Sequence, residues 1–430
     1  MYHWTSLGKT LNDGQRQKKL IITSYQKGIL TALFENGEAV ELQYEADSEE
    51  SLLGNIYVGR VEQVVKNIDA AFLSFGKERT GYYSLKDNKC PCFLNPKNNA
   101  SFHQGDLLLV QVSKEPVKMK EYTLTSDFSL TGRYAVLTVG NNQMSISGKI
   151  TDMAWRDACK EACKHCCTKE YGFIVRTNAG KVSFEVILKE MEELADRFHF
   201  IREKARCLSA HSLILKAPVS YLKNLRDVYD SDLTEILTDK PEIYDGLKAY
   251  LSEKEQTELL GKLSLYQDSL QSLFHLYSLK AVMESALKKR VWLRSGANLV
   301  IEPTEALTVI DVNTGKYSGK KNVEETRLII NKEAAKEIAK QLRLRNISGI
   351  IIVDFINMDS SQSVSELLDY FTTQLRKDPV RTYLAGMTNL GLAEVTRQKG
   401  RKPFAEQLME LEMCEKQRRK EEKKNEEIIY

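Results

Sequence analysis

Residues 306–355 have the sequence ALTVIDVNTGKYSGKKNVEETRLIINKEAAKEIAKQLRLRNISGIIIVDF, in which two apolar segments each end in an aspartate. The first segment ends at Asp311 and the second at Asp354, 43 residues later. A Gly/Lys-rich loop and one helical run separate them, and a strand–helix–strand unit is usually parallel and right-handed. Neighbouring parallel strands end at the same edge of a sheet. The sequence therefore predicts that the two carboxylates lie close together.

Two converging carboxylates need positive charge between them, and a hard cation such as Mg²⁺ prefers oxygen ligands. Asn313 lies two positions after the first aspartate and is placed to orient a water or the substrate, and Lys320 and Lys321 lie in the loop. A metal at such a site polarises a phosphodiester and activates water. In the alternative, structural interpretation, Asp311 caps a turn and Asp354 caps a helix, and the pattern alone leaves both open.

The composition limits the class of protein. The chain has 430 residues, enough for two to four domains at roughly 100–200 residues each, and its formal net charge is +3. With 42% hydrophobic and 28% charged residues, the chain is neither disordered throughout nor a polycation. We find no apolar run long enough to span a membrane and no secretion signal. The eight cysteines form no regular framework, so we expect a reducing cytoplasm.

Much of the N-terminal half has the residue pattern of β-structure. Residues 19–45 alternate on both sides of Glu-Asn-Gly-Glu, which predicts a β-hairpin. Short strands within 54–85 and 105–113 predict a small barrel, with 86–104 as a polar loop. Further strands are expected within 120–150 and at 171–177.

Helices are expected at 152–170, 184–206, 220–227, 268–289 and 323–345, and another helix with a short strand is expected between 355 and about 397. The helix at 323–345 has Leu328, Ala335, Ile338 and Leu342 on one stripe. Residues 291–313 predict two strands, and the continuous apolar run 349–355 predicts a strand that is buried on both faces.

Several long motifs together resemble the ribonuclease E/G family. They include residues 292–358 and four other stretches, GNIYVGRV, AAFLSFGKERTGYYSL, TLTSDFSLTGRYAVL and NLGLAEVTRQKGR. The resemblance extends over about residues 18–402. It implies a multidomain α/β and α+β fold, in which an OB-fold β-barrel and a 5′-sensor domain are inserted in an RNase H-like subdomain and a deoxyribonuclease I-like catalytic domain follows. The implied boundaries are a flexible N-terminus (1–17), the RNase H-like subdomain (18–50 and 223–285), the OB-fold domain (51–126), the 5′-sensor domain (127–222), the catalytic domain (286–400) and a charged tail (401–430).

The resemblance also implies an activity. Members of the family hydrolyse single-stranded RNA internally in a Mg²⁺-dependent reaction and leave a 5′-phosphate and a 3′-hydroxyl. Asp311 and Asp354 match the Mg²⁺-binding aspartates and Asn313 the asparagine beside them, with Glu305 as a weaker outer candidate. We therefore expect a cytoplasmic endoribonuclease that acts in RNA processing, including that of ribosomal RNA, or in RNA decay. The alternatives are an RNA-binding adaptor without catalysis and, less favoured, a nucleotide-phosphate enzyme that uses the Gly-Lys-Lys loop.

Three residues of the expected OB-fold domain match RNA-binding positions of the family. Phe72 and Tyr82 match aromatic rings that stack on bases, and Lys120 matches a cation that contacts phosphate. An aromatic ring stacks on any base, so such a surface holds a strand without reading its sequence. The alternative for Phe72 is a place in the core, because the surrounding stretch AAFLSF is apolar.

Four residues match the pocket in which the family binds an RNA 5′-monophosphate. Arg176 and Thr177 would contact the phosphate, and Gly132 and Val136 match the neighbouring wall. A guanidinium fork and a hydroxyl suit a terminal phosphate. The chain departs from the family at Gly148, where an arginine is often found.

The zinc link that joins two chains in well-studied members is expected to be missing. Where those members have a CPxC motif this chain has only Cys414, so a homodimer would not form through a shared zinc. Cys159, Cys163 and Cys166 share a helical face, for which we weigh a metal site against the favoured interpretation of small buried residues.

Overall fold

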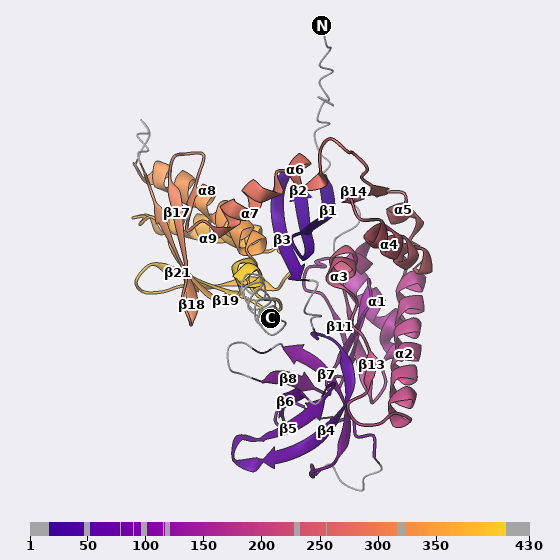
Figure 1. The fold of residues 1–430 in the computed structure, drawn as a ribbon. Coiled ribbons are helices and arrows are strands. Elements are labelled where there is room, and N and C mark those ends of the chain that lie inside the picture. Colours follow the sequence, from indigo (N-terminus) through magenta and orange to yellow (C-terminus); the bar gives the residue numbers. More distant parts are fainter. Residues whose placement is uncertain are drawn as a thin grey trace, which may run out of the picture. The chain divides into compact units, whose positions relative to one another are not determined.

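A computed structural model describes residues 17–46, 52–77, 79–88, 90–95, 101–114, 116, 121–227, 233–254, 256–315 and 323–409. The chain forms two compact units (Figure 1). The first unit combines residues 1–49 with 228–430, and the second is the continuous segment 50–227 that lies between these two parts in the sequence. Each unit is described by itself.

The first sheet of the first unit joins two segments that are far apart in the sequence. Its strand order is β15-β14-β1-β2-β3, with β1 (Lys18–Tyr25), β2 (Gly28–Glu35), β3 (Glu38–Ala46), β14 (Leu233–Thr238) and β15 (Leu263–Leu265). The predicted turn at Glu35–Glu38 is confirmed, since Asn36 and Gly37 have φ values of 52° and 82°, as a tight hairpin turn requires. β1 pairs with β14 in parallel and with β2 antiparallel.

Four helices accompany this sheet, namely α4 (Pro241–Glu253), α5 (Thr257–Leu260), α6 (Leu273–Leu276) and α7 (Leu279–Leu287). The prediction of one helix over 268–289 is wrong, because α6 ends before Ser278, which has a left-handed φ of 48°. Ser272 caps α6 by accepting from the amide of His275. The apolar spacing continues across this break, so periodicity alone could not reveal it.

The second sheet of this unit has six strands in the order β16-β17-β18-β19-β21-β20. They are β16 (Arg290–Trp292), β17 (Asn298–Pro303), β18 (Leu307–Asn313), β19 (Gly349–Asp354), β20 (Thr382–Met387) and β21 (Leu392–Arg397). Residues 291–313 thus contribute to three strands instead of the predicted two, because a turn at 293–297 folds the first stretch into a hairpin.

Two helices, α8 (Val323–Leu344) and α9 (Ser361–Leu375), cover one face of the six-stranded sheet. The predicted helix over 323–345 is confirmed, and its stripe packs in the core, where Ala335, Ile338 and Leu342 have no exposed surface. The prediction that 349–355 is buried on both faces is wrong. Ile351 and Val353 face the helices, whereas Ile350 is 52% exposed on the opposite face. The sheet therefore has one open face.

The predicted boundary between catalytic domain and tail at residue 400 is too early. Phe404 is fully buried against the first sheet and α7, and its amide donates to the carbonyl of Arg345. Gln407 accepts a hydrogen bond from the amide of Tyr44 at 2.8 Å. Residues 401–409 therefore belong to the folded unit, and the rest of the expected tail lies outside the described residues.

The second unit contains a closed barrel of five strands (Figure 1). They are β4 (Ile56–Val65), β5 (Ala70–Phe75), β6 (Arg79–Ser84), β7 (Leu107–Lys114) and β8 (Tyr122–Thr125), and a β4–β7 pairing closes the ring. β13 (Leu213–Leu215) adds to β4, and η1 (Lys66–Ile68) links β4 to β5. The predicted barrel is confirmed. The loop 86–104 is less polar than predicted, because Phe93 and Phe102 contact each other and Phe102 contacts Tyr83.

The rest of this unit is a four-stranded sheet in the order β11-β12-β10-β9, with helices packed on it. The strands are β9 (Ser129–Thr131), β10 (Ala135–Val139), β11 (Met144–Ile146) and β12 (Tyr171–Val175). The helices are α1 (Met153–Cys163), η2 (Lys164–Cys166), η3 (Thr177–Lys181), α2 (Phe184–Arg206) and α3 (Ser220–Asp227). The helix predicted over 152–170 is shorter than expected, with Asp152 as its N-cap.

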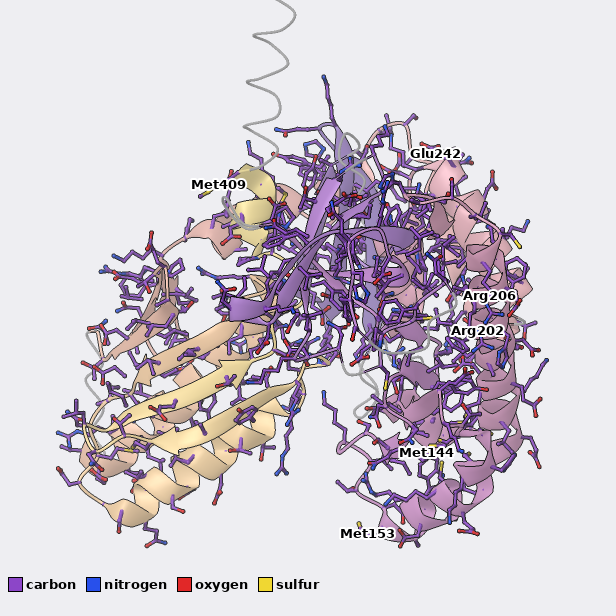
Figure 2. All side chains as sticks on the ribbon, turned by 90° about the horizontal axis from the view of Figure 1, so that it is seen from below. Met144, Met153, Arg202, Arg206, Glu242 and Met409 are labelled. Carbon is purple, nitrogen blue, oxygen red and sulfur yellow. The ribbon has the colours of Figure 1, made fainter. Side chains whose placement is uncertain are left out.

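The surfaces of both units carry many charged side chains (Figure 2). Arg202 and Arg206 project from the last turns of α2, where they form ion pairs with Glu170 and Glu203. Within the described residues, no helix is both long enough and apolar enough to cross a lipid bilayer.

A buried ion pair at the edge of the six-stranded sheet predicts a large stability effect. Asp378 and Arg397 are each 3% exposed, and the Arg397 Nε lies 2.7 Å from a carboxylate oxygen of Asp378. Asp378→Ala leaves this guanidinium buried without its counter-ion, which should lower the free energy of unfolding by about 3–5 kcal/mol. Urea denaturation followed by circular dichroism measures the loss. The exposed Asp369 on α9 offers a control whose change to Ala should stay within about 0.5 kcal/mol; equal losses in the two variants contradict the prediction.

Candidate functional site

Asp311 and Asp354 are directly opposite each other in the six-stranded sheet. β18 and β19 pair in parallel, and the register aligns Ile310 with Val353 and Asp311 with Asp354. Because paired residues point to the same face, both carboxylates extend from the face that the helices leave open. Adjacent strands are about 4.8 Å apart. The prediction that the two aspartates meet is therefore confirmed.

Asn313 belongs to the same cluster. It lies two residues after Asp311 on the same face of β18, and its Nδ2 donates a hydrogen bond of 2.7 Å to the Asp311 carboxylate. This bond turns the Oδ1 of Asn313 away from Asp311. Asp311 is half-buried, whereas Asn313 and Asp354 are exposed, so solvent reaches the cluster.

The cluster suits a hydrated hard cation. Like charges directly opposite each other in a sheet destabilise it, and a cation between them removes this cost. The described residues contain no group of three His, Cys, Asp or Glu side chains arranged for a metal. This cluster offers two carboxylates, from Asp311 and Asp354, and the amide oxygen of Asn313. Mg²⁺ keeps several waters and is often bound through one or two carboxylates. One buried neutral oxygen nearby, the Oδ1 of Asn298, has no hydrogen-bond partner among the described residues.

Three further residues expected near this cluster either lie elsewhere or fall outside the described residues. Glu305 lies just before the first residue of β18, whereas Asp311 and Asn313 lie at the other end of this strand. Its predicted outer role at the aspartates is therefore wrong. Lys320 and Lys321 lie outside the described residues.

Phe72 and Tyr82 are paired on the outer surface of the barrel. They are directly opposite each other on β5 and β6, with ring centroids 6.1 Å apart at an interplanar angle of 72°. Both are partly exposed, whereas Tyr83 is fully buried. The alternation predicted for the two tyrosines is confirmed, and the alternative that placed Phe72 in the core is wrong.

The register extends this aromatic pair into a row across the barrel. Tyr82 is opposite Thr123 of β8, and Thr123 is opposite Lys114, the exposed last residue of β7. Lys120, the predicted phosphate contact, lies outside the described residues. Lys114 was missed from the sequence, although a lysine that ends a predicted strand is a recognisable signal.

Arg176 and Gly132 meet at the edge of the four-stranded sheet. Arg176 follows β12, and its Nη1 donates to the carbonyl oxygen of Gly132 at 2.8 Å. The hydroxyl of Thr177 lies 3.0 Å from that of Ser147. Val136 is opposite Ile174 on the adjacent strand, and Val136 is partly exposed whereas Ile174 is exposed. The structure thus brings all four predicted pocket residues to one edge.

Glu190 of α2 holds the turn between β9 and β10, a role the sequence did not reveal. Its carboxylate accepts hydrogen bonds of 2.7–2.8 Å from the amides of Arg133, Tyr134 and Ala135. A Cβ at Gly132 would lie 2.5 Å from the Glu190 carboxyl carbon, so a larger residue here would displace the Glu190 carboxylate. No local pattern links a helix glutamate to a turn more than fifty residues earlier.

The loop after β11 is fixed by Arg156. The Nη1 of Arg156 donates to the carbonyl oxygens of Ser147 and Ile150 at 2.8 and 3.0 Å. Gly148, where the family often has arginine, has no atom within 4 Å of an added Cβ. The loop therefore has space for a side chain that this protein lacks.

The cysteine cluster on α1 is part of the core. Cys159 and Cys163 have no exposed surface and contact each other. This contact, together with burial, raises the pKa of Cys163, and burial raises the pKa of Cys166 to about 11. The thiolate form that metals require is therefore disfavoured at Cys163 and Cys166, whereas the contact with Cys163 lowers the pKa of Cys159. The burial of Cys159 and Cys163 in the core supports the interpretation of small buried residues. Cys414 lies outside the described residues.

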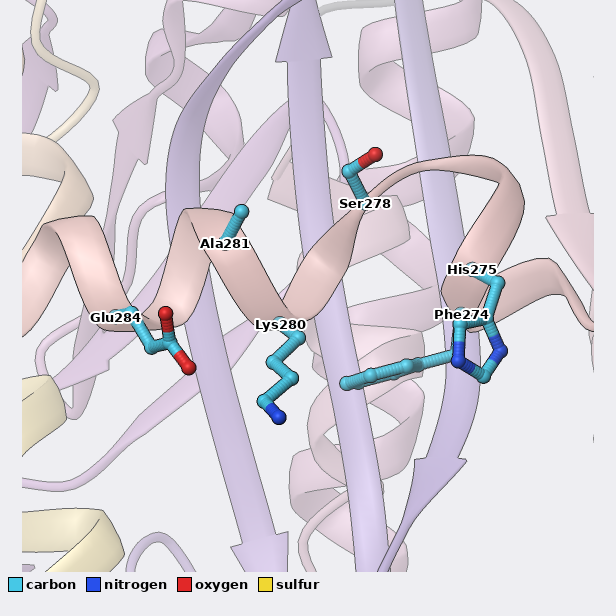
Figure 3. A pocket seen from close by; sticks show the side chains of 6 residues that line it. All are labelled: Phe274, His275, Ser278, Lys280, Ala281 and Glu284. Carbon is cyan, nitrogen blue, oxygen red and sulfur yellow. The ribbon is translucent and has the colours of Figure 1, made fainter.

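A surface hollow on α6 and α7 is separate from these clusters (Figure 3). Its lining residues are Phe274, His275, Ser278, Lys280, Ala281 and Glu284. None of the predicted site residues lines it.

Comparison with known proteins identifies relatives along most of the chain. The model of the ribonuclease E/G family matches residues 129–400. Ribonuclease E of Synechocystis sp. is 34% identical over 387 residues, which cover 89% of this chain and 57% of that relative. Ribonuclease G of Haemophilus influenzae is 34% identical over 380 residues, or 86% of this chain and 77% of the relative. Ribonuclease G of Escherichia coli K12 is 32% identical over the same number of residues. The chain thus spans little more than half the length of the Synechocystis protein.

The turn held by Glu190 can be tested by substitution. Glu190→Gln keeps the size of the side chain but removes the charge and places an NH₂ group against backbone donors. We expect the free energy of unfolding to fall by about 2–4 kcal/mol, because charge-assisted hydrogen bonds are lost. Urea denaturation measures it, with Glu192→Gln on the exposed side of the same helix as control. Similar stabilities of the two variants would show that the hydrogen bonds of Glu190 to the turn contribute little to folding.

Proposed function

This chain belongs to the ribonuclease E/G family, and we propose that it is an endoribonuclease that cleaves single-stranded RNA in a Mg²⁺-dependent reaction, leaving a 5′-phosphate and a 3′-hydroxyl. The observation that carries the proposal is the register of β18 and β19, which sets Asp311 opposite Asp354 on an open sheet face. Such a face admits a polymer, because none of the helices that the structure describes packs on it.

In this proposal the aspartates hold the cation and Asn313 orients the cluster. The bound cation supplies Lewis acidity toward the scissile phosphate and lowers the pKa of water. Asp311 and Asp354 contribute carboxylate oxygens from adjacent strands. The hydrogen bond from Asn313 fixes one rotamer of Asp311 and leaves the Asn313 Oδ1 for water or RNA.

The barrel would hold RNA through the surface of Phe72 and Tyr82. Stacking on an aromatic side chain contributes about 1–3 kcal/mol per base and requires bases that are not stacked in a duplex. Lys114 at the end of the same row, and Lys120, would contact phosphates. The expected preference for single strands follows from this combination.

The edge around Arg176 would bind the 5′-monophosphate that stimulates cleavage. Arg176 and Thr177 offer a guanidinium fork and a hydroxyl, and Gly132 and Val136 form the adjacent wall. The hydrogen bonds of Glu190 and of Arg176 to the turn support a preformed site. Because Gly148 adds no charge, we expect weaker binding of RNA beside this pocket than in family members that have arginine there.

The names of the subdomains are also part of the proposal. The closed five-stranded barrel supports an OB fold for 51–126. The first sheet, in which β14 and β15 extend β1 in parallel, supports an RNase H-like subdomain. We assign the six-stranded sheet with α8 and α9 to the deoxyribonuclease I-like domain. The four-stranded sheet with α1 and α2 is the 5′-sensor domain.

We place the enzyme in the cytoplasm, in RNA processing, ribosomal RNA included, or in RNA decay. Any homodimer would form without a shared zinc. The second candidate function is an RNA-binding adaptor without catalysis, and the paired aspartates weigh against it, because RNA binding alone does not require two carboxylates that repel phosphate.

The aspartates give the decisive prediction for catalysis. Asp311→Asn should lower the rate of cleavage of a single-stranded oligoribonucleotide by at least about 10³-fold, because metal catalysis contributes several kcal/mol. Product analysis on denaturing gels, with Mg²⁺ or with EDTA, measures the rate. Glu366→Gln is the control, because Glu366 pairs with Lys332 on the helix-covered side of the same sheet, and this variant should cleave at the wild-type rate. Equal cleavage by Asp311→Asn and wild type would refute the assignment, and binding without cleavage by wild type would favour the adaptor.

The 5′ pocket is tested separately with Arg176→Ala. The ratio of cleavage rates for 5′-monophosphate and 5′-hydroxyl RNA should fall toward one, while the rate for 5′-hydroxyl RNA stays within about twofold of wild type, since only the contact with the terminal phosphate is lost. Arg206→Ala, which changes an exposed arginine of the same unit, should keep the wild-type ratio. An equal loss on both RNAs would remove the sensor role from Arg176.

A further inference from the structure

Asn298, the first residue of β17, is buried beside the paired aspartates. It is 6% exposed, although it lies at the end of a strand. Its neighbours Ala297 and Leu299 belong to the core between the sheet and the helices. Because side chains alternate along a strand, Asn298 extends from the opposite, open face.

The register sets Asn298 directly across from Asn313. β17 pairs antiparallel with β18, so Asn298 is opposite Asn313 and Val300 is opposite Asp311. On its other side, Asn298 is opposite Trp292 of β16. Asn298 is therefore in the row next to the two aspartates, on the same face.

The amide oxygen of Asn298 receives no hydrogen bond within the described part of the chain. Its Oδ1 is almost completely buried, and none of these residues donates to it. A buried acceptor without a partner costs about 1–3 kcal/mol, and nearly all such groups in native proteins are satisfied. The Nδ2 of Asn313 already donates to Asp311. Packing against the helix core does not explain an amide here, because Asn298 is on the other face.

We propose that Asn298 is, after Asn313, a second positioning residue of the cation site, whose Oδ1 accepts a hydrogen bond from a water of the hydrated divalent cation held by Asp311 and Asp354. The inference rests on the proposed function, since it needs a cation at the aspartates. It gives the unpaired oxygen a partner that only the loaded protein has. Groups that orient the ligands of a metal typically change its affinity 10–100-fold when lost.

Two substitutions separate this role from a structural one. Asn298→Leu keeps the approximate size and removes the acceptor. We expect the dissociation constant for Mn²⁺ to rise about tenfold, while the melting temperature without metal stays equal or increases, since a buried unpaired group is gone. Asn298→Asp keeps the acceptor and adds a negative charge. It should bind Mn²⁺ at least as tightly as wild type, with a lower melting temperature without metal.

Free Mn²⁺ measured by electron paramagnetic resonance gives the affinities of the full chain without RNA, and differential scanning calorimetry gives the melting temperatures. Asp311→Asn is the reference variant. If Asp311→Asn weakens Mn²⁺ binding and Asn298→Leu does not, the role of Asn298 is refuted and the cation site stands. If neither variant changes the binding seen in wild type, or wild type binds no Mn²⁺, both the inference and the cation site fail.

Discussion

The pairing of β18 with β19 determines the chemistry of this protein. A parallel register that aligns Ile310 with Val353 necessarily aligns Asp311 with Asp354, and a shift by one residue would send one carboxylate into the helix-covered core. The alternation of buried and exposed residues prevents this shift, because Ile351 and Val353 must face α8 and α9. The same packing that stabilises the sheet thus holds two like charges together on its open face.

Each candidate surface for binding RNA lies on the uncovered side, or at the edge, of a sheet or barrel whose other side is packed. In the six-stranded sheet, helices bury one face and leave the aspartates on the other. In the barrel, Tyr83 fills the interior while Phe72 and Tyr82 remain partly exposed. In the four-stranded sheet, α2 covers one face and its Glu190 fixes the turn beside Arg176. A rigid support with one uncovered side suits the recognition of a long, flexible polymer.

The sequence predicted the parts that depend on local pattern. Helix 323–345, the turn at Asn36-Gly37, the barrel and the meeting of the aspartates all follow from periodicity, turn chemistry or strand order. Prediction from the sequence failed where the local pattern does not contain the deciding feature. The left-handed backbone of Ser278 separates α6 from α7, and Phe404 packs on β-strands that are distant in the sequence. Glu190 binds the backbone of a turn to which no pattern in its own helix points. The exposure of Ile350 was missed because the apolar sequence of a strand does not determine whether one or both of its faces are covered.

The most direct test of the central claim is the position of the metal. Crystals grown with Mn²⁺ and measured near the manganese absorption edge would locate the ion by its anomalous signal. We predict one peak within about 2.0–2.3 Å of a carboxylate oxygen of either Asp311 or Asp354, and within one water of the other. A well-occupied peak elsewhere, with none at these aspartates, would contradict the account.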